Sequence, residues 1–166
     1  MVSFDLWIPA LTKPKETFAS AKKKASWGDA ILQFVIAGVI AGLISGFIGG
    51  AAAASALADQ PGVTVTGAGS AVLGGLGAIF LAITTPIVMV VGAFIVCAII
   101  GFLVNAIFKR KGELKQFYYV VALYNAPLTI VNSVLGAIPV VGMLTFVTML
   151  YGLYLLYLSI KEVYQL

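Results

Sequence analysis

The chain has 166 residues, of which 61% are hydrophobic and 10% are charged. A soluble globular domain carries about 25% charged residues, so this chain cannot form the polar shell that such a domain needs. The same richness in apolar residues excludes an intrinsically disordered chain. The mean hydropathy of +1.10 and the long uncharged runs predict an integral membrane protein, and we expect an all-α, polytopic helical bundle.

The distribution of reactive residues argues against catalysis. The chain contains no His, and Asp and Glu are absent from 30–58, 67–108 and 117–160. These absences leave no imidazole base, no His ligand for a metal and no pair of carboxylates at membrane depth. The single cysteine, Cys97, lies in an apolar run and is interpreted as a small buried residue. We therefore predict no enzyme activity, no catalytic residue, no metal site and no cofactor.

Residues 1–29 form a basic segment before the first apolar run and contain half of the lysines and arginines. Apolar side chains such as Phe4, Leu6 and Trp7 stand close to charged ones, a mixture that suits the headgroup region of a membrane. Pro14 is suited to the first position of a short helix. The segment is predicted to dock at the interface, and a solvated basic tail is the alternative.

The remainder, 30–166, is predicted to be a single transmembrane helical domain. Its first span covers 30–58, and these 29 residues make a helix of about 43 Å, longer than a hydrocarbon core of about 30 Å. This helix must tilt, or its Ala-rich end must project beyond the core. The third and fourth spans are expected at 117–135 and 140–160, joined by a tight turn at 136–139.

The second uncharged run, 67–108, is too long for one simple span and barely long enough for two. Positive charge favours the cytoplasmic side, and a single crossing places all ten lysines and arginines there. We therefore predict four crossings with both termini cytoplasmic. The crossing is assigned to 85–108, and Pro86 is expected to kink or break the helix. The Gly-rich residues 67–83 are then re-entrant, interfacial or a helical extension.

Four glycines recur at a spacing of four in the first span: Gly38, Gly42, Gly46 and Gly50. This spacing places them on one side of a helix, where the missing side chains let another backbone come close. The sequence does not decide whether the partner helix belongs to the same chain or to another subunit.

Two further sets of residues are candidate sites. The first set consists of basic residues beside the apolar runs, which are expected to contact anionic lipid headgroups: Lys22, Lys23, Lys24, Lys109, Arg110 and Lys111. A role in setting the topology alone would explain these residues equally well. Uncharged polar residues and prolines within the runs form a possible kink or polar pathway: Thr84, Thr85, Pro86, Asn105, Asn125 and Pro127. Hydrogen bonding to neighbouring helices is the favoured interpretation of the polar residues, and lining of a solute path is the alternative.

Short motifs in chain order resemble those of the Yip family of Ypt/Rab-interacting membrane proteins. They are Pro14-Lys15-Glu16-Thr17-Phe18, Lys111-Gly112-Glu113-Leu114-Lys115-Gln116-Phe117, Tyr124-Asn125-Ala126-Pro127, Ile138-Pro139, Gly152-Leu153-Tyr154 and Ser159-Ile160-Lys161-Glu162-Val163-Tyr164. The resemblance implies a helical membrane protein of a family whose eukaryotic members are associated with vesicle traffic, Rab GTPases and membrane shaping. The chain departs from the pattern in two places. Val163-Tyr164 stands where the family often has Val-His, and Leu166 ends the sequence where members usually continue into a fifth span.

Two functions are compatible with the residues and the resemblance. The first is a non-enzymatic membrane scaffold or adaptor that acts through helix packing, oligomerisation and lipid contact, in membrane organisation or trafficking. Its candidate partners are membrane lipids with anionic headgroups, a second copy of the chain and another protein, but not nucleic acid. The second is a small channel or transporter for an ion or a small neutral solute. In a prokaryote, the expected location is the cell membrane.

Overall fold

The structure, a computed structural model, describes residues 4–61, 64, 66–109, 112–136, 138 and 143–166. Short helices occupy the N-terminal region: η1 (Phe4–Leu6), α1 (Trp7–Thr12), α2 (Pro14–Ala21) and η2 (Lys22–Lys24). Four long helices follow: α3 (Trp27–Ala58), α4 (Gly67–Phe108), α5 (Leu114–Gly136) and α6 (Leu144–Tyr164). The regular structure of these described residues is entirely helical, as expected of a chain that must satisfy its backbone hydrogen bonds within lipid.

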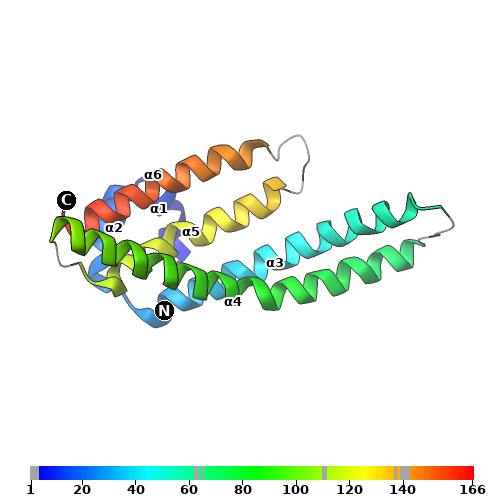
Figure 1. Cartoon of the computed structure of the whole chain (residues 1–166), viewed down its shortest axis with the longest axis horizontal. Helices are drawn as coiled ribbons and strands as arrows, with labels where there is room; N and C mark the ends of the chain where they lie inside the picture. The colour runs from blue at the N-terminus through cyan, green and yellow to red at the C-terminus, as the bar shows by residue number, and fades with distance from the viewer. Residues whose placement is uncertain (1–3, 62–63, 65, 110–111, 137, 139–142) are drawn as a thin grey trace.

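The prediction of an all-α polytopic bundle is confirmed, because all four long helices are long and apolar enough to cross a membrane. They form two antiparallel hairpins, α3–α4 and α5–α6 (Figure 1). The α3–α4 hairpin extends well past the end of α5–α6, whereas both chain termini and the α4–α5 connection gather at the opposite end (Figure 1). We call these two ends the distal tip and the charged end.

The second uncharged run is helical along its whole length. One continuous helix, α4, covers Gly67–Phe108, so the Gly-rich part is the helical extension among the three alternatives. Pro86 lies inside this helix and does not end it. The Thr66 side chain accepts a hydrogen bond from the amide of Gly69 and caps the helix start. Helix α6 covers Leu144–Tyr164, and residues 140–142 of the fourth span predicted at 140–160 lie outside the described part.

Close backbone packing holds α3 against α4. A Cβ atom added to any of the four regularly spaced glycines of α3 would lie within 3 Å of α4 atoms. The partners descend along α4 as the glycines ascend along α3: Gly38 faces Pro86, Gly42 faces Leu81, Gly46 faces Ala78 and Gly50 faces Gly74. The partner of this glycine face therefore lies in the same chain, and Pro86 is buried as one of its contacts.

An aromatic cluster joins α5 to the α3–α4 hairpin. The ring of Tyr118 lies 5.4 Å from Trp27, 5.3 Å from Phe34 and 6.1 Å from Phe94, measured between centroids. The Tyr118 hydroxyl donates a hydrogen bond of 3.0 Å to the carbonyl of Val90, which satisfies this polar atom inside the bundle. Residues 117–124 of α5 are all buried, so α5 is the central helix at the charged end.

The N-terminal helices pack against the bundle and are not a solvated tail. Ala10 and Phe18 are fully buried, and the Phe18 ring lies 6.0 Å from that of Tyr124 in α5. Trp7 Nε1 donates to Gln33 Oε1 of α3 at 3.2 Å, and the Tyr151 hydroxyl of α6 donates to the carbonyl of Leu11. Hydrogen bonds to two different spans therefore fix α1 across the bundle.

We predict that Gly46→Ala destabilises the protein by about 1–3 kcal/mol, because its methyl group meets the Ala78 backbone and forces the two helices apart. The measurement is thermal or denaturant unfolding in mild detergent. Gly49→Ala is the matched control, since an added Cβ at Gly49 has no atom within 4 Å. Equal loss of stability in both variants would contradict the packing role assigned to Gly46.

Candidate functional site: a polar cleft beside the central helix

A cleft of about 430 Å³ lies beside α5, with lining residues from all four long helices. Its volume lies within the range of about 300–1,000 Å³ that is typical of small-molecule sites. Most lining side chains are apolar, including Val88, Val96, Leu153 and Leu156. The charged residues of the described chain are absent from this lining. The cleft is therefore an apolar space with a small number of neutral polar groups.

The polar groups of the cleft come mainly from one face of α5. Asn125, Thr129 and Asn132 follow at intervals of four and three residues, which places them in line along the helix. Thr129 Oγ1 donates to the Asn125 carbonyl at 2.9 Å and lies 3.1 Å from Asn125 Oδ1. Thr148 of α6 donates to Asn132 Oδ1. The side-chain oxygen of each asparagine thus lies beside a threonine hydroxyl, whose single proton also has a backbone carbonyl within reach, that of Asn125 for Thr129 and that of Thr145 for Thr148.

The amide nitrogens of the two asparagines belong to the polar face of α5 that lines the cleft. Within the described part of the chain, neither Asn125 Nδ2 nor Asn132 Nδ2 donates a hydrogen bond. Each Asn side chain carries two such N–H groups. The polar face of α5 therefore presents donors to the cleft and needs acceptors there.

Tyr164 brings α4 and α6 together at the charged end. This buried side chain lies so close to Gly101 of α4 that an added Cβ there would be 2.6 Å from the tyrosine oxygen. Its ring also packs edge-to-face with Phe117 at a centroid distance of 5.7 Å. From this contact α4 and α6 diverge, with α5 between them (Figure 1). Residues of both helices line the cleft, together with α5 and Phe34 of α3.

The structure brings only one of the predicted pathway residues to the cleft, Asn125. Thr84 Oγ1 donates to the carbonyl of Phe80 in its own helix, and Asn105 is exposed one turn before the end of α4. Thr85, Pro86 and Pro127 are half-buried or buried in their helices and are absent from the lining of the cleft. The six predicted residues do not converge on one site.

Thr129, Asn132 and Thr148 were not among the six predicted pathway residues. Thr129 and Asn132 share a helical face with Asn125, and this spacing is the signal that would have found them. Thr148 lies on α6, and no local pattern links it to this face. Gly92 and Cys97 also line the cleft, and no sequence pattern indicates this. Among the described residues, no group of three or more His, Cys, Asp and Glu could hold a metal ion.

Among the described basic residues, Lys22, Lys23 and Lys24 form η2, and Lys109 directly follows α4. Lys23, Lys24 and Lys109 are exposed, whereas Arg110 and Lys111 lie outside the described residues. Lys22 is different, because its Nζ atom lies 2.7 Å from Glu162 Oε1 and donates to the Glu162 carbonyl at 2.9 Å. This ammonium group therefore binds the end of α6 to the N-terminal segment.

The comparisons with known proteins give one result. A family model described as the Yip1 domain matches residues 9–166. No curated protein and no solved structure matches the chain.

The ion pair between Lys22 and Glu162 yields a prediction about the N-terminal segment. Because both side chains are less than a third exposed, we expect Lys22→Gln to cost about 1 kcal/mol. Hydrogen exchange of residues 14–24 should then become faster, while exchange in α3 stays unchanged. Lys23→Gln serves as the control, since this lysine is exposed. An identical exchange pattern in both variants would show that the pair does not hold the segment.

Proposed function

Since the chain belongs to the Yip family of membrane proteins, we propose that it is a non-enzymatic membrane scaffold or adaptor. In this proposal it acts through self-association and contact with lipid, in membrane organisation or trafficking. The observation that supports the proposal best is the size and surface of the α3–α4 hairpin.

The hairpin is too long for a bilayer. The 42 residues of α4 make a helix of about 63 Å, against a hydrocarbon core of about 30 Å. Even a tilt of about 40°, the upper end of the usual range, leaves a projected length of about 48 Å. In contrast, the 23 and 21 residues of α5 and α6 make helices of about 34 and 32 Å, which match the core. The distal tip therefore projects beyond the layer that α5 and α6 fit.

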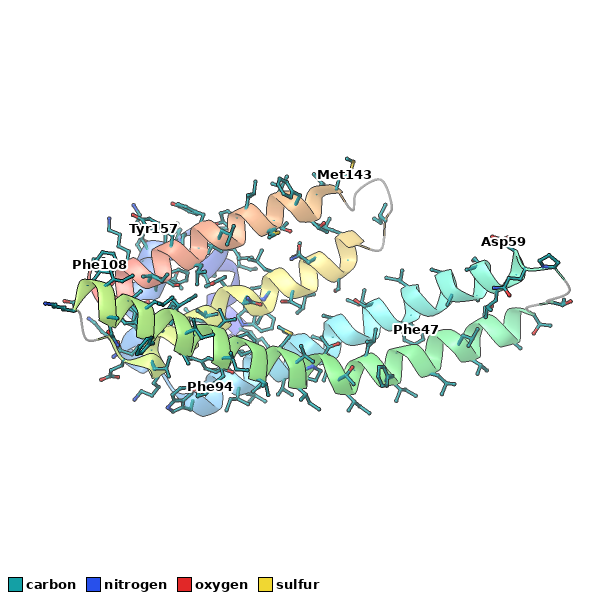
Figure 2. The ribbon with its side chains drawn as sticks, viewed as in Figure 1. Phe47, Asp59, Phe94, Phe108, Met143 and Tyr157 are labelled. Carbon is teal, nitrogen blue, oxygen red and sulfur yellow. The ribbon has the colours of Figure 1, made fainter. Side chains whose placement is uncertain are left out.

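The projecting part of α4 carries a continuous apolar surface. Its large exposed side chains follow at helical spacing along one side: Val72, Leu76, Ile79, Phe80 and Ile83, each 59–64% exposed. Asp59 lies at the tip of the hairpin and Met143 at the end of α6, set back along the bundle (Figure 2). An apolar surface of this kind outside the hydrocarbon favours association with a similar surface. A second copy of the chain supplies one.

The basic residues at the charged end support two parts of the proposal: contact with anionic lipid, and the orientation of the protein in the membrane. Exposed Lys23, Lys24 and Lys109 gather there, where each basic residue gains about 1 kcal/mol from an anionic surface. The same distribution favours the cytoplasmic side for this end and for both termini. In a prokaryotic cell, the membrane concerned is the cell membrane.

The alternative function is a small channel or transporter, and the cleft beside Asn125 is the observation that favours it. Two features weigh against conduction. The polar residues of the cleft occupy only the half of α5 nearer its C-terminal end, and Tyr164 packs against Gly101 at the other end. Flux into proteoliposomes is the test. Uptake of an ion or neutral solute that Gly92→Phe abolishes would favour transport over a scaffold.

We predict that the protein forms dimers or larger oligomers in lipid nanodiscs, through the distal part of α4. Phe80→Ala should weaken the association about tenfold, because it truncates a large side chain at the centre of the apolar surface. Native mass spectrometry over a range of protein-to-lipid ratios measures the effect. Phe102→Ala is the matched control, being an exposed phenylalanine of the same helix near the charged end. A wild-type protein that stays monomeric at every ratio would refute self-association.

The orientation is tested with variants in which the buried Cys97 is replaced and one new cysteine is introduced elsewhere. In intact cells, a membrane-impermeant maleimide should label Asp59→Cys at the distal tip. Labelling of Lys23→Cys should require permeabilised cells, because the charged end is expected to face the cytoplasm. The reverse pattern, or labelling of both sites in intact cells, would contradict the proposed topology.

A further inference from the structure

We propose that the cleft beside α5 binds a glycerophospholipid through the oxygen atoms of its glycerol–ester region. The inference is independent of the scaffold function, because it concerns a different surface. It begins from the two asparagine amides. A polar group that enters the hydrocarbon without a hydrogen-bond partner costs free energy, so the donors at Asn125 and Asn132 require acceptors inside the cleft.

The position of the cleft decides which molecules reach it. Residues of α4 and α6 line the cleft, and several of them, among them Val96 and Leu153, are about half exposed, at 51% and 52%. The opening therefore faces sideways into the bilayer. A lipid is the first molecule that such an opening meets.

The chemistry of the lining fits an amphipathic occupant. Apolar side chains from α4 and α6 suit acyl chains, while Asn125 and Asn132 supply donors from α5. Ester and phosphate oxygens are acceptors that need no donor of their own. A transmembrane helix of a second copy fits less well, because its backbone carbonyls are already satisfied within that helix. Water alone would leave the apolar walls hydrated.

The depth of the polar residues places the lipid in one leaflet. Asn132 stands four residues before the end of α5 at Gly136, a rise of about 6 Å, and Asn125 stands eleven residues before it, a rise of about 16 Å. The donors therefore extend from the membrane boundary away from the charged end to about the middle of the bilayer. A lipid held by these donors lies in that leaflet, with its ester region deeper in the bilayer than that of the surrounding lipids.

The neutral lining also predicts the specificity. No charged side chain among the described residues reaches the cleft, so binding should depend little on the headgroup. This distinguishes the cleft from the basic charged end, where anionic lipids are favoured. Phosphatidylcholine and phosphatidylglycerol should compete equally for the cleft.

The test uses the full chain in nanodiscs that contain a phosphatidylcholine with a diazirine near the ester end of one acyl chain. After irradiation, mass spectrometry should find cross-links concentrated in 88–97 and 148–156, relative to the exposed Ile99, Phe102 and Leu103. Asn125→Leu should lower this labelling about fivefold, the effect of losing one hydrogen bond of ordinary strength. This variant retains the bond from Thr129 to the backbone carbonyl of residue 125.

A second variant fills the cleft without disturbing a packed contact. Gly92 lines the cleft and an added Cβ there has no atom within 4 Å, so Gly92→Phe should reduce the labelling to background. Gly75→Phe is the matched control, since Gly75 is an equally open glycine of α4 outside the cleft. Unchanged labelling in Gly92→Phe would overturn the proposal.

Two other occupants would also overturn it. Strong oxidation of Met89 by hydroxyl radicals in nanodiscs would show a water-filled cleft, because this methionine lies in the lining. Disulfide cross-linking between copies through Gly92→Cys, in a Cys97→Ala background, would show a second copy in the cleft. A failure of the lipid test leaves the oligomer measurements unaffected, and loss of oligomers leaves lipid labelling unaffected.

Discussion

The close approach of α3 and α4 is the contact on which the rest of the bundle depends. Helices in a bilayer gain little from the hydrophobic effect, because lipid tails are as apolar as their own side chains. Dispersion forces between closely spaced atoms must therefore hold them, and four glycines bring the α3 backbone directly onto α4. This hairpin then forms the surface on which Tyr118 places α5. Helix α6 packs against α5, and the N-terminal helices contact α3, α5 and α6.

The same contact explains why α4 is a single helix despite Pro86. A proline removes a backbone hydrogen bond and tends to bend a helix, and the sequence predicted a kink or a break at Pro86. In the structure Pro86 lies against Gly38, so the ring fills the space where α3 has no side chain. The packing of two extended helices thus outweighs the local preference at one residue. As a result, the α3–α4 hairpin is much longer than the thickness of the layer that α5 and α6 match.

The sequence predicted the parts of the fold that follow from charge and local pattern. The four apolar helices, the glycine face of α3 and the charged end all depend on residues close together in the chain or on a single helix face. It did not predict contacts between distant segments. The hydrogen bond from Trp7 to Gln33 and the ion pair of Lys22 with Glu162 join helices whose relative placement no local pattern specifies. For the same reason Asn125 was identified as a polar residue in a span, but the cleft around it was not.

The two ends of the bundle differ in how tightly their helices are joined. At the charged end, Tyr164 fits against Gly101, and Lys22 and Tyr151 bind the N-terminal segment to α6. Toward the other end, α6 keeps a polar contact with α5 through Thr148 and Asn132, while α4 continues along α3. Because α4 follows the glycines of α3 and α6 follows α5, the two must separate once α3 and α5 diverge. The cleft and the projecting tip therefore both follow from the close packing of the α3 glycines against α4.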